Sequence, residues 1–205
     1  MEYVRYVLDS RADAMEIDIR RYQDGTLIFS HDTHGAIGTM PFPLVTIRSV
    51  FDALRGTDKL VNCDLKEAGL EDDVWHLACE CGVRDQLIYT GTVSASHCVR
   101  KGLHRHVRIA LNIEEYVQDL YERCLNDPRQ SAACAEEMCE VCRAYDIPRI
   151  NANYRLATDG FIKVLERNRI DLSVWTVNEP SQIDRFLSLG VYNLTTRNLT
   201  YALSK

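Results

Sequence analysis

The chain has 205 residues and carries 24 Lys and Arg against 30 Asp and Glu, which gives a formal net charge of -6. The acidic balance argues against a nucleic-acid-binding protein, because such proteins need a dense positive surface for the phosphate backbone. No apolar run approaches the roughly 20 residues of a membrane span, and the charged start, with Glu2 and Arg5, is unlike a signal peptide. We therefore expect one cytoplasmic domain, 1–205, whose eight cysteines are thiols.

Strand and helix patterns alternate along the whole chain. Residues 15–20 alternate apolar and polar side chains, which is typical of a strand, and the extended run 26–29 follows the turn pair Asp24-Gly25. Helices are expected to start at the N-caps Thr46, Thr158 and Ser181. The pattern predicts strands near residues 15, 60, 86, 107, 148, 172 and 191, helices over 47–54, 70–81, 113–124, 131–145, 161–166 and 183–189, and a short helical tail.

Strands that alternate with helices predict a parallel sheet, either open or closed into a barrel. The seven expected strands are one fewer than a TIM-type (β/α) barrel has, and 205 residues lies near the lower end of that fold's size range. No linker, low-complexity stretch or fixed-period repeat interrupts the alternation. The sequence therefore predicts a single α/β domain of the TIM-type barrel class that is missing one strand.

Acidic side chains share one face of the first two parallel strands. Glu16 and Asp18 lie opposite the apolar residues of the first strand, and Asp64 and Lys66 lie opposite those of the second. In a parallel barrel the apolar outer face contacts helices, so these polar side chains are expected to point inward. Converging carboxylates need a positive partner, and all-oxygen ligands favour Ca²⁺ or Mg²⁺. The alternative is that they are salt-bridged rim residues, or that the register is shifted by one residue.

A histidine follows the extended run 26–29. His31-Asp32 lies where strand gives way to loop, and a histidine beside a metal site is a natural proton carrier near neutral pH. Most His-Asp dipeptides are structural, so this pair alone decides nothing.

Taken together, the motifs resemble the glycerophosphodiester phosphodiesterase family. The stretch ADAMEID at 12–18, the turn at 24–26 and His31-Asp32, 13 residues after Asp18, are similar to its Glu-x-Asp … His-Asp pattern. VNCDLK at 61–66 is similar to its third-strand motif, which usually reads Glu-x-Lys. VWTVN followed by Glu-Pro, at 174–180, resembles its seventh-strand motif, and 190–196 resembles its eighth. The resemblance covers nearly the whole chain.

The resemblance implies a barrel enzyme that hydrolyses glycerophosphodiesters to glycerol 3-phosphate and an alcohol, with Ca²⁺ or Mg²⁺ as cofactor and a small molecule as substrate. It also implies the role of each matching residue. Glu16, Asp18 and Asp64 would bind the metal, with Asp64 standing where the family has a glutamate. His31 would be one of two acid–base histidines, Lys66 would bind a phosphate oxygen, and Trp175 would line the substrate pocket.

The chain departs from the family at its start. The family begins with a His-Arg strand, whereas Met1 to Ser10 aligns with the middle of the first helix, so the first strand, the partner histidine and an arginine are missing. Exposed strand edges are then expected beside 15–20 and 191–195, and a homodimer that pairs through them is a prediction. Losing one member of an acid–base pair typically removes about 10²–10⁴-fold of rate. An impaired or truncated relative that binds a phosphate or polyol ligand without turnover is therefore the alternative function.

The cysteines suggest a third interpretation. Cys139-x-x-Cys142 has a spacing used by zinc sites, and Cys134 and the pair Cys79-x-Cys81 add further thiols. However, 131–138 is strongly helical and lacks the Gly or Pro of a metal knuckle, so packing in the core is the favoured explanation.

Overall fold

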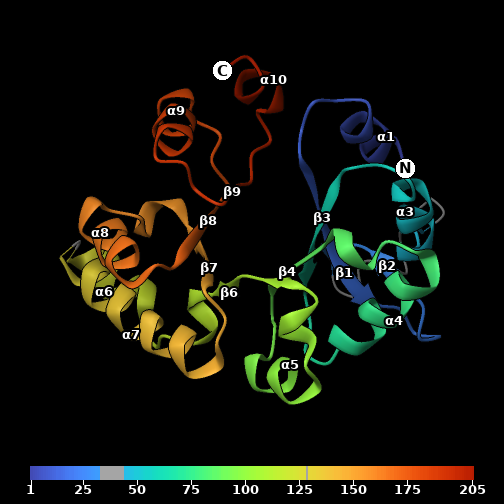
Figure 1. Ribbon diagram of the computed structural model, residues 1–205. Helices are drawn as coiled ribbons and strands as arrows, with labels where there is room; N and C mark the ends of the chain where they lie inside the picture. Colours follow the sequence, from blue (N-terminus) through green and yellow to red (C-terminus); the bar gives the residue numbers. More distant parts are fainter. Residues whose placement is uncertain (33–43, 128) are drawn as a thin grey trace. The chain divides into compact units, whose positions relative to one another are not determined.

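The chain forms two compact units, Met1–Arg108 and Ile109–Lys205. The computed structural model in Figure 1 describes residues 1–32, 44–127 and 129–205. Residue His34 and the rest of 33–43 lie outside the described residues. Both units are built from strands followed by helices, so the α/β class predicted from the alternation is confirmed.

The first unit is organised around a five-stranded sheet in the order β2-β1-β3-β4-β5, where β5 lies at the boundary between the units. Strands β1, β3 and β4 are parallel neighbours, and β2 pairs antiparallel with the end of β1. The elements are α1 (Glu2–Leu8), β1 (Ala14–Arg21), β2 (Leu27–Phe29), α3 (Ile47–Leu54), β3 (Leu60–Leu65), α4 (Glu71–Cys81), β4 (Leu87–Gly91), α5 (Ala95–Lys101) and β5 (Arg108–Ile109), with short 3₁₀ helices at Arg84–Gln86 and Leu103–Arg105.

The second unit has a four-stranded parallel sheet in the order β6-β7-β8-β9. Helices separate its strands, as expected for parallel connections. The elements are β6 (Leu111–Asn112), α6 (Leu120–Asn126), α7 (Gln130–Tyr145), β7 (Arg149–Asn153), α8 (Asp159–Asn168), β8 (Asp171–Trp175), α9 (Pro180–Ser188), β9 (Asn193–Leu194) and α10 (Leu199–Ala202), with 3₁₀ turns at Ile113–Glu115 and Tyr154–Leu156.

The alternation of β1 sorts its side chains between two environments. Met15, Ile17 and Ile19 are almost fully buried, whereas Glu16 and Asp18 between them are only partly buried. The buried side chains belong to the core of the first unit, together with the apolar stripe of α3. This burial fixes the strand's orientation, because a shift of one residue would put the carboxylates into the core.

All seven expected strands are present, and the run 26–29 forms an additional one. The expected strand near 107 is divided between β5 and β6, one in each sheet. Strand β2 pairs with Ile19–Arg21, so the edge that we expected to be exposed beside 15–20 is covered over that part.

Two of the three expected helix caps are confirmed and one is wrong. The hydroxyl oxygens of Thr46 and Thr158 accept hydrogen bonds from backbone amides three residues later, at 3.2 and 3.3 Å. Helix α9 begins at Pro180 rather than after Ser181, with Glu179 as its N-cap. Proline is favoured in the first turn because its missing N–H is not needed there.

The other differences concern short helices. The single helix expected over 113–124 is instead a 3₁₀ turn and the separate helix α6, which starts after Asp119 in the left-handed conformation (φ 51°). Helix α5 was not predicted, although Ser94 caps it by accepting from the amide of His97 at 3.3 Å. His97 therefore lies on a helix. No helix in the described part of the chain is long and apolar enough to cross a bilayer.

Candidate functional site

The pairing of β1 with β3 brings the predicted site residues of the first unit onto one face of the sheet. The two strands are parallel, with Glu16 opposite Asn62 and Asp18 opposite Asp64. Lys66 follows the end of β3, and its backbone amide donates to the carbonyl of Ile19 at 3.1 Å. Neighbouring positions of one sheet face point the same way. The register therefore places two aspartates from different strands side by side.

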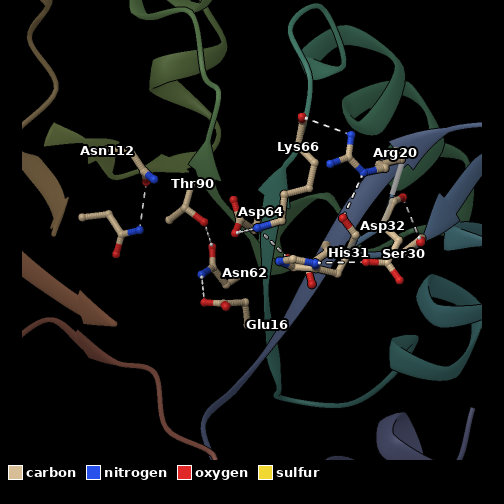
Figure 2. A network of polar contacts seen from close by, with 12 residues as sticks. Glu16, Arg20, Ser30, His31, Asp32, Asn62, Asp64, Lys66, Thr90 and Asn112 are labelled. Carbon is tan, nitrogen blue, oxygen red and sulfur yellow. Dashed lines mark hydrogen bonds and ion pairs between the residues drawn. The ribbon is translucent and has the colours of Figure 1, made fainter. Parts of the chain in front are cut away.

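The ammonium group of Lys66 lies between these two carboxylates (Figure 2). Its Nζ is 2.8 Å from Oδ1 of Asp18 and 2.6 Å from Oδ2 of Asp64. The three side chains are only 17 to 23% exposed. The sequence left open whether these carboxylates bind a metal or form salt bridges, and the structure shows the salt bridges.

The electrostatics of the cluster follow from partial burial. Burial raises the pKa of the Asp64 carboxyl above its ordinary value, although the Lys66 ammonium acts in the opposite direction. For Lys66, burial would lower the pKa of the ammonium, but the carboxylates of Asp64 and Asp18 outweigh burial and the pKa is raised. The lysine therefore stays charged at neutral pH and neutralises part of the negative charge of the pair.

Glu16 belongs to a different set of hydrogen bonds on the same face. Its Oε2 accepts from the amide of Asn62 at 2.9 Å, and Oδ1 of Asn62 accepts from the hydroxyl of Thr90 at 2.9 Å. Within the described ranges, no three His, Cys, Asp or Glu side chains are grouped closely enough to hold a metal ion. The structure thus brings together two of the three predicted metal ligands around one positive charge, and Asn62 holds the third.

His31 lies just beyond β2, close to the cluster in Figure 2. Its side chain is 78% exposed, and its Nδ1 is 3.5 Å from the carboxylate of Asp32. A positive charge on His31 would lower the pKa of the Asp64 carboxyl and so favour its ionised form. A histidine this exposed is accessible to a ligand and to water, as a proton carrier has to be.

Three of the four other described histidines have structural contacts elsewhere. His76 and His97 lie on α4 and α5, and Nε2 of His97 is 3.1 Å from Asp72. His104 contacts the carbonyl of Cys98, and the ring of His106 stacks on Trp75.

Gly91, at the end of β4, is a site feature that the sequence analysis missed. Its backbone has φ +81°, and a Cβ built there would overlap the Asp64 carboxylate and the backbone oxygen of Leu65. Only glycine leaves room for β4 to approach Asp64 this closely. A glycine at the end of an apolar strand is a known signal of such an approach, so the position was recognisable.

A row of polar side chains in the second unit was also missed. Asn112, Asn151, Ser173 and Asn193 are register partners on the four neighbouring strands. Each is hydrogen-bonded to the next, at 2.9, 2.8 and 3.0 Å. Polar residues in the middle of otherwise buried strands are the signal that would have found them.

Trp175 lies at the end of β8, two residues after Ser173 and on the same face of that strand. Its indole N–H is buried and has no hydrogen-bond partner within the described ranges. Buried indole N–H groups usually have a partner, so this one is available to a ligand acceptor.

Among the described residues, the cysteines do not form a group that could hold a metal ion. Cys134, Cys139 and Cys142 are buried along one side of α7, and the thiols of Cys124 and Cys134 are 3.4 Å apart. Such burial among apolar side chains is typical of structural cysteines.

No protein-family model matches the sequence, and no curated protein matches it. Solved structures do match. A protein of Agrobacterium tumefaciens assigned as a glycerophosphoryl diester phosphodiesterase has 16% identity and a TM-score of 0.76, over 99% of this chain and 89% of its own. A glycerophosphodiester phosphodiesterase from Thermotoga maritima has 17% identity and a TM-score of 0.71, over 98% and 88%. A phosphodiesterase from Oleispira antarctica in complex with its product, sn-glycerol-3-phosphate, has 11% identity and a TM-score of 0.70, over 99% and 88%.

These likenesses extend over almost the whole of the chain and confirm the TIM-type fold class predicted from the sequence. At such low identity they establish the fold, and the chemistry has to be argued from the site itself.

Proposed function

We propose that the chain is a metal-dependent phosphodiester hydrolase that cleaves glycerophosphodiesters to glycerol 3-phosphate and an alcohol. The observation that carries the proposal is the meeting of Asp18 and Asp64 on the ammonium of Lys66, at 2.8 and 2.6 Å. The fold is shared with phosphodiesterases, one of which was solved with sn-glycerol-3-phosphate bound. The site therefore combines carboxylates, a cation and an exposed histidine on a fold that supports this reaction elsewhere.

The residues fit a divalent cation by two criteria. Carboxylate oxygens are the hard ligands that Ca²⁺ and Mg²⁺ prefer. The Lys66 ammonium also shows that Asp18 and Asp64 already converge on one positive charge. We propose that these two aspartates hold the cation and that Glu16, on the same face of β1, becomes the third ligand when its carboxylate leaves the amide of Asn62.

Each residue of the site would contribute to hydrolysis in a different way. A bound cation polarises the phosphoryl oxygens and stabilises the charge that develops on them. Lys66, once it leaves the carboxylates, binds a phosphate oxygen and adds to the same stabilisation. His31 carries the proton that the departing alcohol needs when its bond to phosphorus breaks. Trp175, in the second unit, would bind the substrate, and its buried indole N–H has no hydrogen-bond partner within the described residues.

The alternative is a relative that binds a phosphate or polyol ligand without turnover. It is favoured by the position of three of the four other described histidines, which are engaged in contacts at α4, α5 and the following turn. In that case Lys66 and Trp175 would still bind the ligand, and His31 would have no chemical role.

The release of glycerol 3-phosphate from glycerophosphocholine, in the presence of Ca²⁺ or Mg²⁺, separates the two functions. We expect turnover by the chain and a loss of about 10²–10⁴-fold in His31→Ala. His76→Ala, which truncates an exposed histidine of α4, is the matched control and should retain activity. Equal rates for the chain and His31→Ala would remove His31 from the mechanism. Calorimetric binding of glycerol 3-phosphate without any turnover would establish the alternative.

A further inference from the structure

We infer that Arg20 is a positioning residue that ties the segment bearing His31 to the segment bearing Lys66. This inference rests on the proposed function, because it assigns Arg20 to the same site. Arg20 is two residues beyond Asp18 on β1 and therefore lies on the same face of the strand. Its side chain is only 16% exposed although arginine is usually a surface residue.

The guanidinium of Arg20 contacts both segments at once (Figure 2). Its Nε donates to the backbone carbonyl of His31 at 3.2 Å, and its Nη1 donates to the backbone carbonyl of Lys66 at 3.4 Å. The same Nη1 is 3.9 Å from the carboxylate of Glu67, which balances its charge. One side chain thus joins the main chain at two residues that the proposed mechanism uses.

The segment of His31 follows the end of β2 and the segment of Lys66 follows the end of β3. Contacts from Arg20 can therefore hold the main chain of both segments in place. Beyond β2, the amide of Ser30 donates to the carbonyl of Asp18 at 3.0 Å, and the described backbone bonds end there. Beyond β3, the amide of Lys66 donates to Ile19 at 3.1 Å. Apart from Arg20, the contact that the described residues show for the main chain beside His31 is the bond from the Ser30 hydroxyl to the Asp32 carbonyl, 3.3 Å long.

The geometry requires an arginine rather than any cation. A guanidinium has several N–H donors fixed in one plane, so it can donate to two carbonyls that lie in different directions. A lysine has all its donors on one nitrogen at the end of a flexible chain, and their directions are not fixed. Arg20→Lys would keep the positive charge but would lose the simultaneous hydrogen bonds to the carbonyls of His31 and Lys66. Displacing a catalytic group by about 1 Å is enough to cost about 10²-fold in rate.

Kinetics of Arg20→Gln and Arg20→Lys, alone and combined with His31→Ala, test the inference. We expect each single variant to lower kcat for glycerophosphocholine by about 10- to 100-fold. In the His31→Ala background the same change should cost clearly less, because only the effect of Arg20 on the Lys66 segment then remains. Equal losses in both backgrounds would overturn the inference, since Arg20 would then act independently of His31.

A second measurement does not depend on activity. Hydrogen–deuterium exchange should show faster exchange in 28–32 and 65–67 for Arg20→Gln, with α3 unchanged. Arg21→Gln is the matched control, because Arg21 points to the other side of the strand and pairs with Asp73 at 2.5 Å. Unchanged exchange in 28–32 and 65–67 would overturn the inference, even in a fully active protein. If the chain shows no turnover, the proposed function fails, and the exchange result still decides whether Arg20 is a tether.

Discussion

Asp18 and Asp64 come from neighbouring parallel strands, and each lies within 2.8 Å of the same ammonium nitrogen on Lys66. All three side chains are mostly buried, so each depends on the others for compensation of its charge. Under the proposed function, a divalent cation would replace the lysine as the partner of the carboxylates, and a phosphate would replace the carboxylates as the partner of the lysine.

Asp64 should make the stability of the chain depend on pH. Because burial raises its pKa, the folded chain holds a proton on this carboxyl more tightly than the unfolded chain does. Its contribution to stability is therefore full below the ordinary pKa of about 3.9 and is lost as the pH rises through the folded-state value. Urea denaturation of the chain and of Asp64→Asn, with a chelator present, measures this. The difference in unfolding free energy, chain minus variant, should fall from about pH 4 to pH 7. A difference that rises over this range would contradict the assignment.

The sequence predicted the shared face of Glu16, Asp18, Asp64 and Lys66, because alternation along a strand determines which side chains point the same way. It did not predict that Lys66 would lie between the two aspartates. That contact depends on the rotamers of a long flexible side chain, and periodicity carries no information about rotamers. Arg20 was missed for the same reason.

Among the elements, the end of β4 tolerates side chains least, because Gly91 lies against Asp64 and the backbone of Leu65. Gly91 and Gly25 both have a positive φ, of +81° and +89°, but only Gly91 has neighbours where a Cβ would lie. Gly91→Ala should therefore lower the melting temperature clearly more than Gly25→Ala does. Both variants share the strain of the left-handed conformation, roughly 1–2 kcal/mol, so the difference reports the overlap with Asp64 and Leu65. Equal shifts in thermal denaturation would show that β4 does not approach β3 this closely.

Long periodic elements were predicted and short ones were not. Helices α3 and α4 carry buried apolar residues at helical spacing, and a glycine follows soon after each, Gly56 after the C-cap Arg55 of α3 and Gly82 as the C-cap of α4, so their limits followed from the sequence. Helix α5 has seven residues, too few for a periodic pattern to stand out. The break before α6 depends on Asp119 in a left-handed conformation, which aspartate adopts only occasionally.

At the scale of the whole molecule, cysteine burial gives a simple test of the packing. The chain has eight free cysteines, of which only Cys79 is exposed. We expect a thiol reagent such as dithionitrobenzoate to label one group rapidly in the native chain and all eight after denaturation. Cys79→Ser should abolish the rapid phase. Any rapidly labelled thiol in native Cys79→Ser would mean that at least one of the other seven cysteines is not buried as described.

The fold was predictable from the alternation of strands and helices, and the solved structures with TM-scores of 0.70 to 0.76 agree with it. The hydrogen-bonded row from Asn112 to Asn193 was not predictable, since it requires four strands to be in register at one level. Pairing between distant segments is decided by the packed structure rather than by any single strand.

The most direct test of the account is the cation dependence of glycerol 3-phosphate release from glycerophosphocholine. It should be measured over a Ca²⁺ titration for the chain, for Asp18→Asn and for Asp73→Asn, whose aspartate pairs with Arg21 away from the cluster. We predict that the chain and Asp73→Asn are activated alike and lose activity with a chelator, whereas Asp18→Asn needs at least about 10-fold more Ca²⁺ or shows no activation. Activation of Asp18→Asn at the same Ca²⁺ concentration as the chain would contradict the claim that the β1 and β3 carboxylates form one cation site.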